Sequence, residues 1–206
     1  MKNVTLAVLL ALALTARAAT PIPHNPEKTM SDSTRPPQVP PEVARYLQGP
    51  PTESRQFDFL LGDWDVAATR YREDGAVLFH YRARWTARSL NGGRMVMDDF
   101  QARLPGGEAI SSFVTLRTYS ESTHRWEIAG LGAHQPSTIG DWHGAWKEGE
   151  MLLDAAGKDA QGQPVLTKIR FFEIGPDSFA WESRISRDDG KTWSRSASLK
   201  ASRAAP

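Results

Sequence analysis

Four residues have the types and spacing that acid–base chemistry requires. Asp98 and Asp99 follow a Met-Val-Met run within one predicted strand, and a single tryptophan separates Asp141 from His143. A carboxyl group directed into an apolar interior would have a raised pKa and could transfer a proton, as an isomerase, cyclase, hydratase or lyase requires. Because side chains alternate across a strand, one residue of the Asp98–Asp99 pair must face outward, whereas Asp141 and His143 share a face.

Asp141 and His143 could also act together, with the carboxylate orienting the imidazole or with both holding a metal. No third ligand accompanies them, and polar pairs two residues apart are common on the outer face of a barrel, so we predict no metal site. The chain has no cysteine, which excludes disulfides, thiolate catalysis and Cys-ligated zinc or iron–sulfur clusters. It also lacks the Gly-x-Ser-x-Gly, Walker, His-Glu-x-x-His and dinucleotide-binding motifs, so familiar hydrolase or nucleotide chemistry has no support.

The elements that must position these residues are strands. Between 77 and 90 the odd positions up to 87 are apolar, and the even positions from 80 to 88 are polar or cationic; this period of two predicts a long strand and excludes an amphipathic helix. Further strands are predicted near 94–103, 110–119, 125–131, 138–146, 150–154, 166–174, 178–186 and 193–201, separated by short Gly-, Asp- and Pro-containing turns. With no helical apolar period after Gly62, we predict an all-β fold: an antiparallel meander of about ten strands that closes into a barrel and so removes its edges.

Aromatic residues dominate the predicted inward faces of these strands. A wall of this kind suits a small, largely apolar ligand, although a small barrel can also be filled by its own side chains. The candidate ligand-binding residues are Phe79, Tyr81, Trp85, Trp126, Trp142 and Trp181.

The start of the barrel carries the sequence Phe-Asp-Phe-Leu-Leu-Gly-Asp-Trp from position 57. Gly62-x-Trp64 after an apolar lead-in resembles the opening of lipocalin and other calycin barrels. Most of 55–203 resembles a group of bacterial secreted, lipocalin-like proteins of unknown function. The resemblance implies that Trp64 closes one barrel end beneath a late arginine. Arg195 or Arg203 could supply it, and we prefer Arg195 because Arg203 lies three residues from the chain end.

A second motif begins at Ser186 and reads Ser-Arg-Asp-Asp-Gly-Lys-Thr-Trp. It resembles the Asp box of sialidases and other extracellular β proteins. We expect Asp188 to satisfy backbone amides of a tight turn, Gly190 to supply a positive φ, and Trp193 to pack on the hairpin stem. One copy in about 150 residues is too little for a propeller, so we interpret the motif as a structural turn, with sugar contact as the alternative.

The resemblance also bears on cofactors. Related heme-binding barrels use a histidine in the C-terminal part of the chain, and this sequence has none after His143. His134 or His143 would have to substitute, so no heme and no other cofactor is predicted.

The first 54 residues differ from the rest in composition. Residues 1–19 have the basic start, short apolar core and small-residue end of a cleaved signal peptide. The apolar core is too short to serve as a membrane anchor. Residues 20–54 hold nine of the 14 prolines and are expected to form a linker, with two helical turns at 41–48. Without a cysteine after the cleavage site, we expect a secreted or periplasmic protein whose barrel spans 55–203.

Charge and composition limit the classes of function that this chain can have. The 206 residues are 40% hydrophobic and 24% charged, with a formal charge of +1, which favours a globular domain over a nucleic-acid-binding protein. Three functions stay open: a binder of a small apolar molecule, an acid–base enzyme using the same pocket, and an envelope interaction scaffold. The oligomeric state has no signal in the sequence.

Overall fold

The computed structural model describes residues 39–133, 138–159 and 161–205. The chain divides into two units, Met1–Val39 and Pro40–Pro206. All helices and strands that the structure describes belong to the second unit. The predicted signal peptide (1–19), the linker up to residue 38 and His134 lie outside the described residues.

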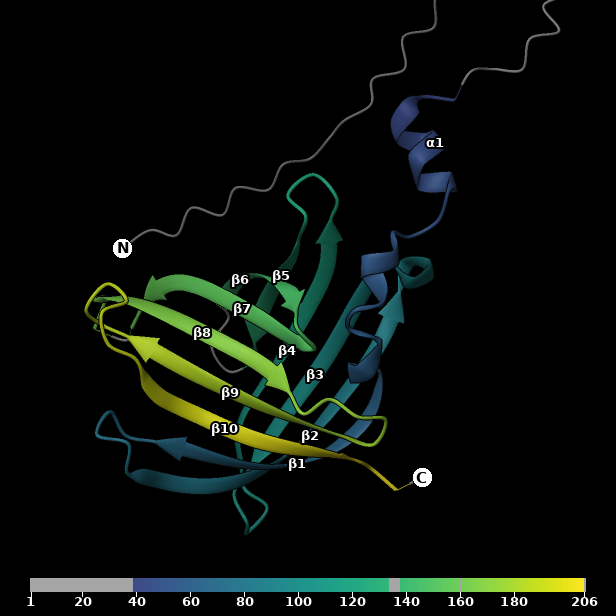
Figure 1. Ribbon diagram of the computed structural model, residues 1–206. Helices are drawn as coiled ribbons and strands as arrows, with labels where there is room; N and C mark the ends of the chain where they lie inside the picture. The colour runs from purple at the N-terminus through teal and green to yellow at the C-terminus, as the bar shows by residue number, and fades with distance from the viewer. Residues whose placement is uncertain (1–38, 134–137, 160, 206) are drawn as a thin grey trace, which may run out of the picture. The chain divides into compact units, whose positions relative to one another are not determined.

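Ten antiparallel strands form a closed barrel (Figure 1). Strands adjacent in sequence pair with each other, and β1 pairs with β10 to close the sheet. The predicted all-β meander is therefore confirmed. The strands are β1 (Gly62–Tyr71), β2 (Val77–Leu90), β3 (Met95–Arg103), β4 (Ala109–Ser120), β5 (Arg125–Gly132), β6 (Thr138–Lys147), β7 (Glu150–Lys158), β8 (Pro164–Phe172), β9 (Ser178–Ser186) and β10 (Ser194–Arg203).

Alternation along β2 shows how the sequence sets the two faces of the wall. Ala83, Trp85 and Ala87 are buried, whereas Arg82 and Arg84 between them are exposed. Side chains of a strand point alternately to the two sides of the sheet, so the apolar residues face the interior and the arginines face solvent.

The helices are short and lie before or between the strands. They are α1 (Pro41–Leu47) and the 3-10 turns η1 (Thr52–Arg55), η2 (Asp58–Leu60) and η3 (Asn91–Gly93). Helix α1 occupies the segment for which two helical turns are predicted, begins with a proline and buries no side chain. Within the described ranges, no helix has the length and apolar character needed to span a membrane.

Residues just before β1 plug one end of the barrel. Phe57 and Leu60 are fully buried, and Ser54 in η1 is nearly so. The Phe57 ring meets Trp126 edge-on at 4.7 Å between ring centroids. In Figure 1 these turns lie on the right, on the same side as the C-terminus. The plug begins before residue 55, the boundary predicted from the sequence.

Candidate functional site

The barrel encloses a cavity of about 790 Å³. Its lining includes Arg72 and Glu73 from the β1–β2 turn and Arg187 from the β9–β10 turn, so the mouth opens at the end opposite the plug. The volume falls within the range of small-molecule sites. Part of the interior is therefore not filled by the protein's own side chains.

The cavity wall is aromatic over much of its area. Five of the six predicted ligand-binding residues line it: Phe79, Tyr81, Trp85, Trp142 and Trp181. Burial raises the pKa of the Tyr81 hydroxyl, which therefore stays protonated at neutral pH. The wall offers flat apolar surfaces with a few hydroxyl groups among them.

Trp126, the sixth predicted residue, is not among the cavity-lining residues. It is fully buried at the closed end, where its indole N–H donates to Gln56 Oε1 at 3.0 Å and its ring packs on Phe57. The prediction that Trp126 contacts ligand was wrong because strand alternation gives the face on which a side chain lies but not its depth along the barrel.

A buried charged cluster lies at the floor of the cavity. The Asp98 side chain has no exposed surface and forms an ion pair with Arg117, which is 4% exposed. The carboxylate also accepts hydrogen bonds from Trp85 Nε1 at 2.6 Å and from the Thr115 hydroxyl. Trp85, Thr115 and Arg117 line the cavity, whereas Asp98 lies behind them.

Arg117 connects this cluster to the plug. Its guanidinium carbon lies 5.0 Å from the centroid of the Phe57 ring. Burial lowers the pKa of Arg117 to about 9, so the group is still protonated at neutral pH, and the adjacent carboxylate favours that charged form. Within the described part of the chain, the buried Nε of Arg117 has no hydrogen-bond partner.

The other candidate acid–base residues lie outside the cavity. Asp99 accepts a hydrogen bond at 2.8 Å from Gln101, whose side chain is exposed. Asp141 is exposed. Trp142 lines the cavity, so His143, the next residue of the strand, faces the outside of the barrel. The possibility that Asp141 orients His143 has no support: His143 Nδ1 lies 2.5 Å from Glu127 Oε2 on the neighbouring strand, because cross-strand residues are closer than residues two apart on one strand.

Glu127, on the outer face of β5, interacts with Thr123, Arg125 and His143. Its pKa is lowered by hydrogen bonds, first from Arg125 and then from Thr123 and His143, against a smaller opposing effect of burial. Together with Asp141, this surface forms no metal site: in residues 39–133, 138–159 and 161–205, no three His, Cys, Asp or Glu side chains are grouped to hold an ion.

The arginine that stacks on the closing tryptophan is Arg203, and the preference for Arg195 was wrong. The Arg203 guanidinium carbon lies 3.8 Å from the Trp64 ring centroid. The two residues are partners across β1 and β10, and the backbone N–H of Arg203 is fixed by Asp177. Arg203 lies near the chain end but does not fray, because closure of the barrel pairs the last strand with the first.

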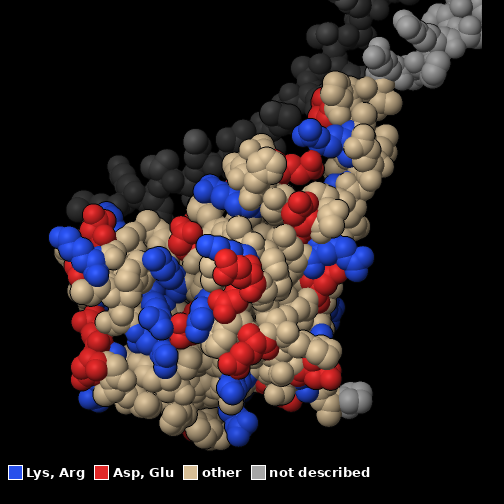
Figure 2. Space-filling model, viewed as in Figure 1, with Lys and Arg blue, Asp and Glu red and all other residues tan. Residues whose placement is uncertain are grey.

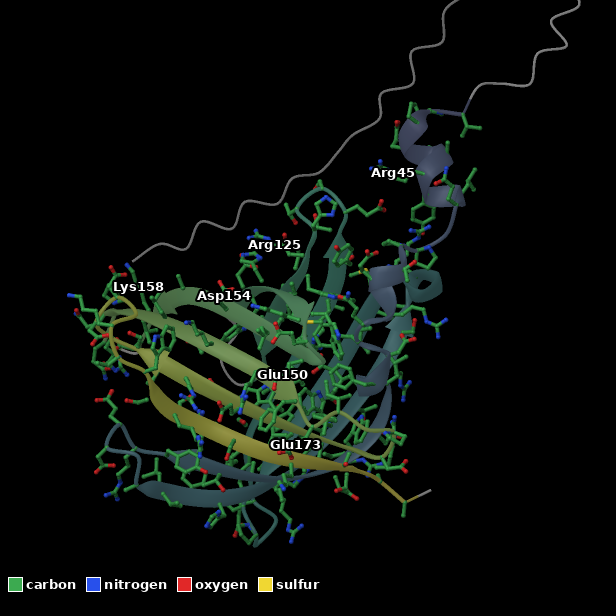
Figure 3. The ribbon with its side chains drawn as sticks, in the orientation of Figure 1. Arg45, Arg125, Glu150, Asp154, Lys158 and Glu173 are labelled. Carbon is green, nitrogen blue, oxygen red and sulfur yellow. The ribbon has the colours of Figure 1, made fainter. Side chains whose placement is uncertain are left out.

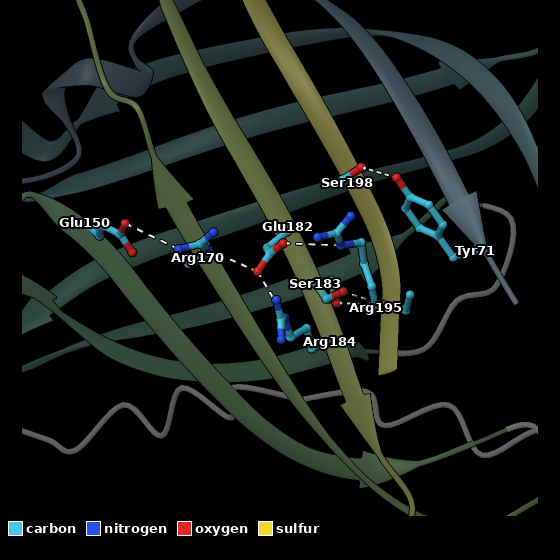
Figure 4. A network of polar contacts seen from close by, with 9 residues as sticks. Tyr71, Glu150, Arg170, Glu182, Ser183, Arg184, Arg195 and Ser198 are labelled. Atoms are coloured by element: carbon cyan, nitrogen blue, oxygen red, sulfur yellow. Dashed lines mark hydrogen bonds and ion pairs between the residues drawn. The ribbon is translucent and has the colours of Figure 1, made fainter. Parts of the chain in front are cut away.

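Arg195 instead belongs to a network on the outer face of β8, β9 and β10 (Figure 4). Glu182 lies at its centre, 6% exposed, within 3.0 Å of Arg170 and Arg184 and 3.4 Å of Arg195. Arg170 also reaches Glu150 at 3.5 Å, and Figure 3 shows Glu150 on β7. Glu182 thus points outward, away from the cavity that its neighbours Trp181 and Ser183 line, but is covered by three guanidinium groups.

Charges of both signs cover the surface that surrounds this network. Figure 2 shows Lys and Arg side chains interspersed with Asp and Glu over the viewed face. The cavity lining contains four arginines (Arg70, Arg72, Arg117 and Arg187) and one acidic residue, Glu73. Two of these arginines form ion pairs, Arg117 with Asp98 and Arg187 with Glu73 and Asp159.

The Asp-box segment forms the β9–β10 turn. Asp188 accepts hydrogen bonds from the backbone N–H of Thr192 at 2.9 Å and its hydroxyl at 2.7 Å, and from Ser186 at 2.8 Å. These donors lower the pKa of Asp188 to about 2, with the Thr192 hydroxyl the largest contributor. Gly190 has a φ of +82°, and Trp193 Nε1 donates to its carbonyl at 3.0 Å. The Ser186 and Asp188 side chains and the Trp193 indole N–H thus form hydrogen bonds within the turn, whereas Arg187 pairs with Glu73 and Asp159 outside it.

Comparisons with known proteins support the fold. No protein-family model matches the sequence, and the search of curated proteins found no match. Two solved structures are similar at 12% identity: Rv2717c from M. tuberculosis, with a TM-score of 0.56 over 76% of this chain and 99% of that one, and the S-type phycobiliprotein lyase CPES from Guillardia theta, with a TM-score of 0.54 over 78% and 97%. At this identity the similarity concerns the fold alone.

Sequence reasoning did not identify Arg117 as part of the site. The signal was present, because Phe113, Thr115 and Arg117 share one parity in β4 and Asp98 shares that of Val96 and Phe100 in β3. Two polar residues and one acid on apolar faces of neighbouring strands indicate a buried polar cluster.

Proposed function

We propose that the barrel binds a small, largely apolar organic molecule in its interior. The observation that carries this proposal is the cavity of about 790 Å³, open at one end and lined by aromatic side chains. A stable barrel needs no such space, since interiors are normally packed to the density of organic crystals. Binding a ligand would cover the apolar surface that the cavity exposes.

The alternative of an acid–base enzyme retains only Asp98 among its candidates. That carboxylate is surrounded by three donors from Trp85, Thr115 and Arg117 and is separated from the cavity by them. A general acid or base must reach the proton that it transfers. The geometry therefore supports binding better than catalysis.

The test uses two variants on neighbouring positions of β4. Ser111 lines the cavity, whereas Ser112 does not. Ser111→Phe places a ring inside the cavity, and Ser112→Phe adds the same ring on the other face. An apolar fluorophore such as anthracene should bind the wild type and Ser112→Phe saturably and Ser111→Phe at least about tenfold more weakly. Equal binding by all three proteins would rule out the cavity as the site.

We also propose that the protein is a calycin-type barrel of the bacterial secreted, lipocalin-like kind, exported by residues 1–19. Gly62-x-Trp64 and the arginine stacked on Trp64 support the first part. The basic, apolar and small-residue pattern of 1–19 supports the second. N-terminal sequencing of protein from the periplasm or medium tests export: a start near Thr20 supports it, and retention of Met1 in the cytoplasm contradicts it.

A further inference from the structure

The outer wall of β3, β4 and β5 carries an exposed apolar patch. Val114 and Leu116 in β4 are 40% and 41% exposed, and Leu131 in β5 is 57% exposed. Val114 lies opposite Leu131, and Leu116 lies between Met97 of β3 and Ala129 of β5, so all five residues share the outer face. We call these five residues the β3–β5 patch. Contiguous apolar surface on a folded domain is typical of a surface that contacts another molecule.

The row of paired residues through the patch ends in opposite charges. Cross-strand pairing aligns five residues, one from each strand from β2 to β6: Arg88, Met97, Leu116, Ala129 and Asp141. The two charged side chains at the ends are exposed, and within the described ranges neither takes part in an ion pair. Leu116 is therefore the midpoint of a row that has a cation at one end and an anion at the other.

Such a row is complementary to a second copy of itself. A two-fold axis that runs along β4 in the plane of contact, over Leu116, would place Arg88 of each copy opposite the partner's Asp141. A closed two-fold dimer requires a surface that complements itself in this way, whereas an unrelated partner has no need for the reversal of sign about Leu116. The formal charge of +1 on 206 residues adds little repulsion between two copies.

The area of the patch favours a weak dimer over an obligate one. Four strand spacings of about 4.8 Å and two residue rows give the patch with its charged ends roughly 300 Å². A stable interface covers about 800 Å² per partner, so we expect a dissociation constant of about 10–100 µM. Beside Val114, Asp99 accepts a hydrogen bond from Gln101, which gives the patch a polar edge as in other protein interfaces.

We propose that the protein forms a reversible two-fold homodimer through the β3–β5 patch. Leu116 lies on the two-fold axis, and Arg88 of each copy pairs with the partner's Asp141. The patch lies on the side wall of the barrel, whereas the residues of the cavity mouth lie in turns at one end. Dimer formation therefore leaves the mouth open.

The first experiment is sedimentation velocity of the full chain over about 1–500 µM, a range that brackets the expected dissociation constant. The average mass of the wild type should rise from that of one chain towards that of two. Leu116→Glu places two like charges on the axis and should remain a monomer. Leu152→Glu is the matched control, because Leu152 is 38% exposed on β7, outside the patch, and this variant should associate like the wild type.

Two outcomes of this experiment would overturn the proposal. A wild type that stays monomeric throughout the range would leave the patch to a different partner. Association of Leu116→Glu equal to that of Leu152→Glu would show that copies meet through another surface.

Exchange of the two charged ends tests the two-fold arrangement itself. Arg88→Glu and Asp141→Arg should each weaken association about tenfold, because each places like charges opposite one another. The double variant Arg88→Glu/Asp141→Arg should recover most of this loss, since both contacts are restored with reversed sign. Thermal unfolding at low protein concentration should change little in any of the three, because both side chains are exposed. A double variant that associates no better than the single variants would overturn the pairing of Arg88 with the partner's Asp141.

Discussion

The central carbon of the Arg203 guanidinium lies over the Trp64 ring, 3.8 Å from its centroid. It also donates to the carbonyls of Leu61 and Pro176, the latter at 3.1 Å. One side chain thus joins the plug, the end of β10 and the loop after β8, and it covers the tryptophan whose indole N–H donates to Leu60 at 2.7 Å.

This arrangement predicts unequal effects of two arginine substitutions. Arg203→Met should lower the free energy of unfolding by about 1–3 kcal/mol, because it removes a cation–π contact and two hydrogen bonds. Arg195→Met should cost less, about 1 kcal/mol, since Arg195 is partly exposed and the change removes a 3.4 Å ion pair with Glu182 and a long cation–π contact of 5.5 Å with Tyr71. Trp64→Ala should cost about 3–5 kcal/mol by opening a cavity. Urea unfolding of the three variants measures these differences, and equal losses from both arginine variants would contradict the assignment.

Gly62 should tolerate no side chain. Its φ is +104°, and a Cβ there would lie 2.5 Å from Arg203 Nη1. Gly62→Ala should therefore cost about 1–3 kcal/mol through backbone strain, plus the displacement of Arg203. Gly75→Ala is the matched control, because Gly75 has a φ of +84° with nothing within 4 Å of the new Cβ. Thermal unfolding should show the larger loss for Gly62→Ala; a loss no larger than that of Gly75→Ala would show that Arg203 moves aside freely.

The Asp98–Arg117 pair should behave as a coupled unit. Asp98→Leu leaves a buried guanidinium without its partner and should cost about 3–5 kcal/mol, whereas the double variant Asp98→Leu/Arg117→Met should recover much of that loss. A double-mutant cycle by urea unfolding gives the coupling free energy. Strictly additive losses would mean that the two side chains do not interact.

Asp188 should make stability depend on pH in the acid range. Its pKa is lowered to about 2 from a usual value near 4 in the unfolded chain, so its contribution to stability is present above about pH 4 and is lost as pH falls through about 2. At pH 6 Asp188→Asn should unfold at a lower temperature than the wild type, and the difference should shrink on acidification to pH 2. A difference that is constant between pH 6 and 2 would contradict the assigned hydrogen bonds.

Much of this architecture follows from local sequence, and the exceptions have physical reasons. Alternation in β2 gives its ends and the inward positions of Tyr81 and Trp85, because strand geometry depends on neighbouring residues. The depth of Trp126 depends on the plug that Phe57 forms, and the stacking of Arg203 depends on the pairing of the first strand with the last. Both are long-range contacts, which a period of two does not encode.

Binding in the cavity is the central claim, and titration with anthracene tests it most directly. We predict saturable, one-site binding to the wild type and to Ser112→Phe, with binding to Ser111→Phe weakened by about tenfold or more. The absence of saturable binding to the wild type, or equal affinity in Ser111→Phe, would contradict the claim that the barrel interior is a ligand site.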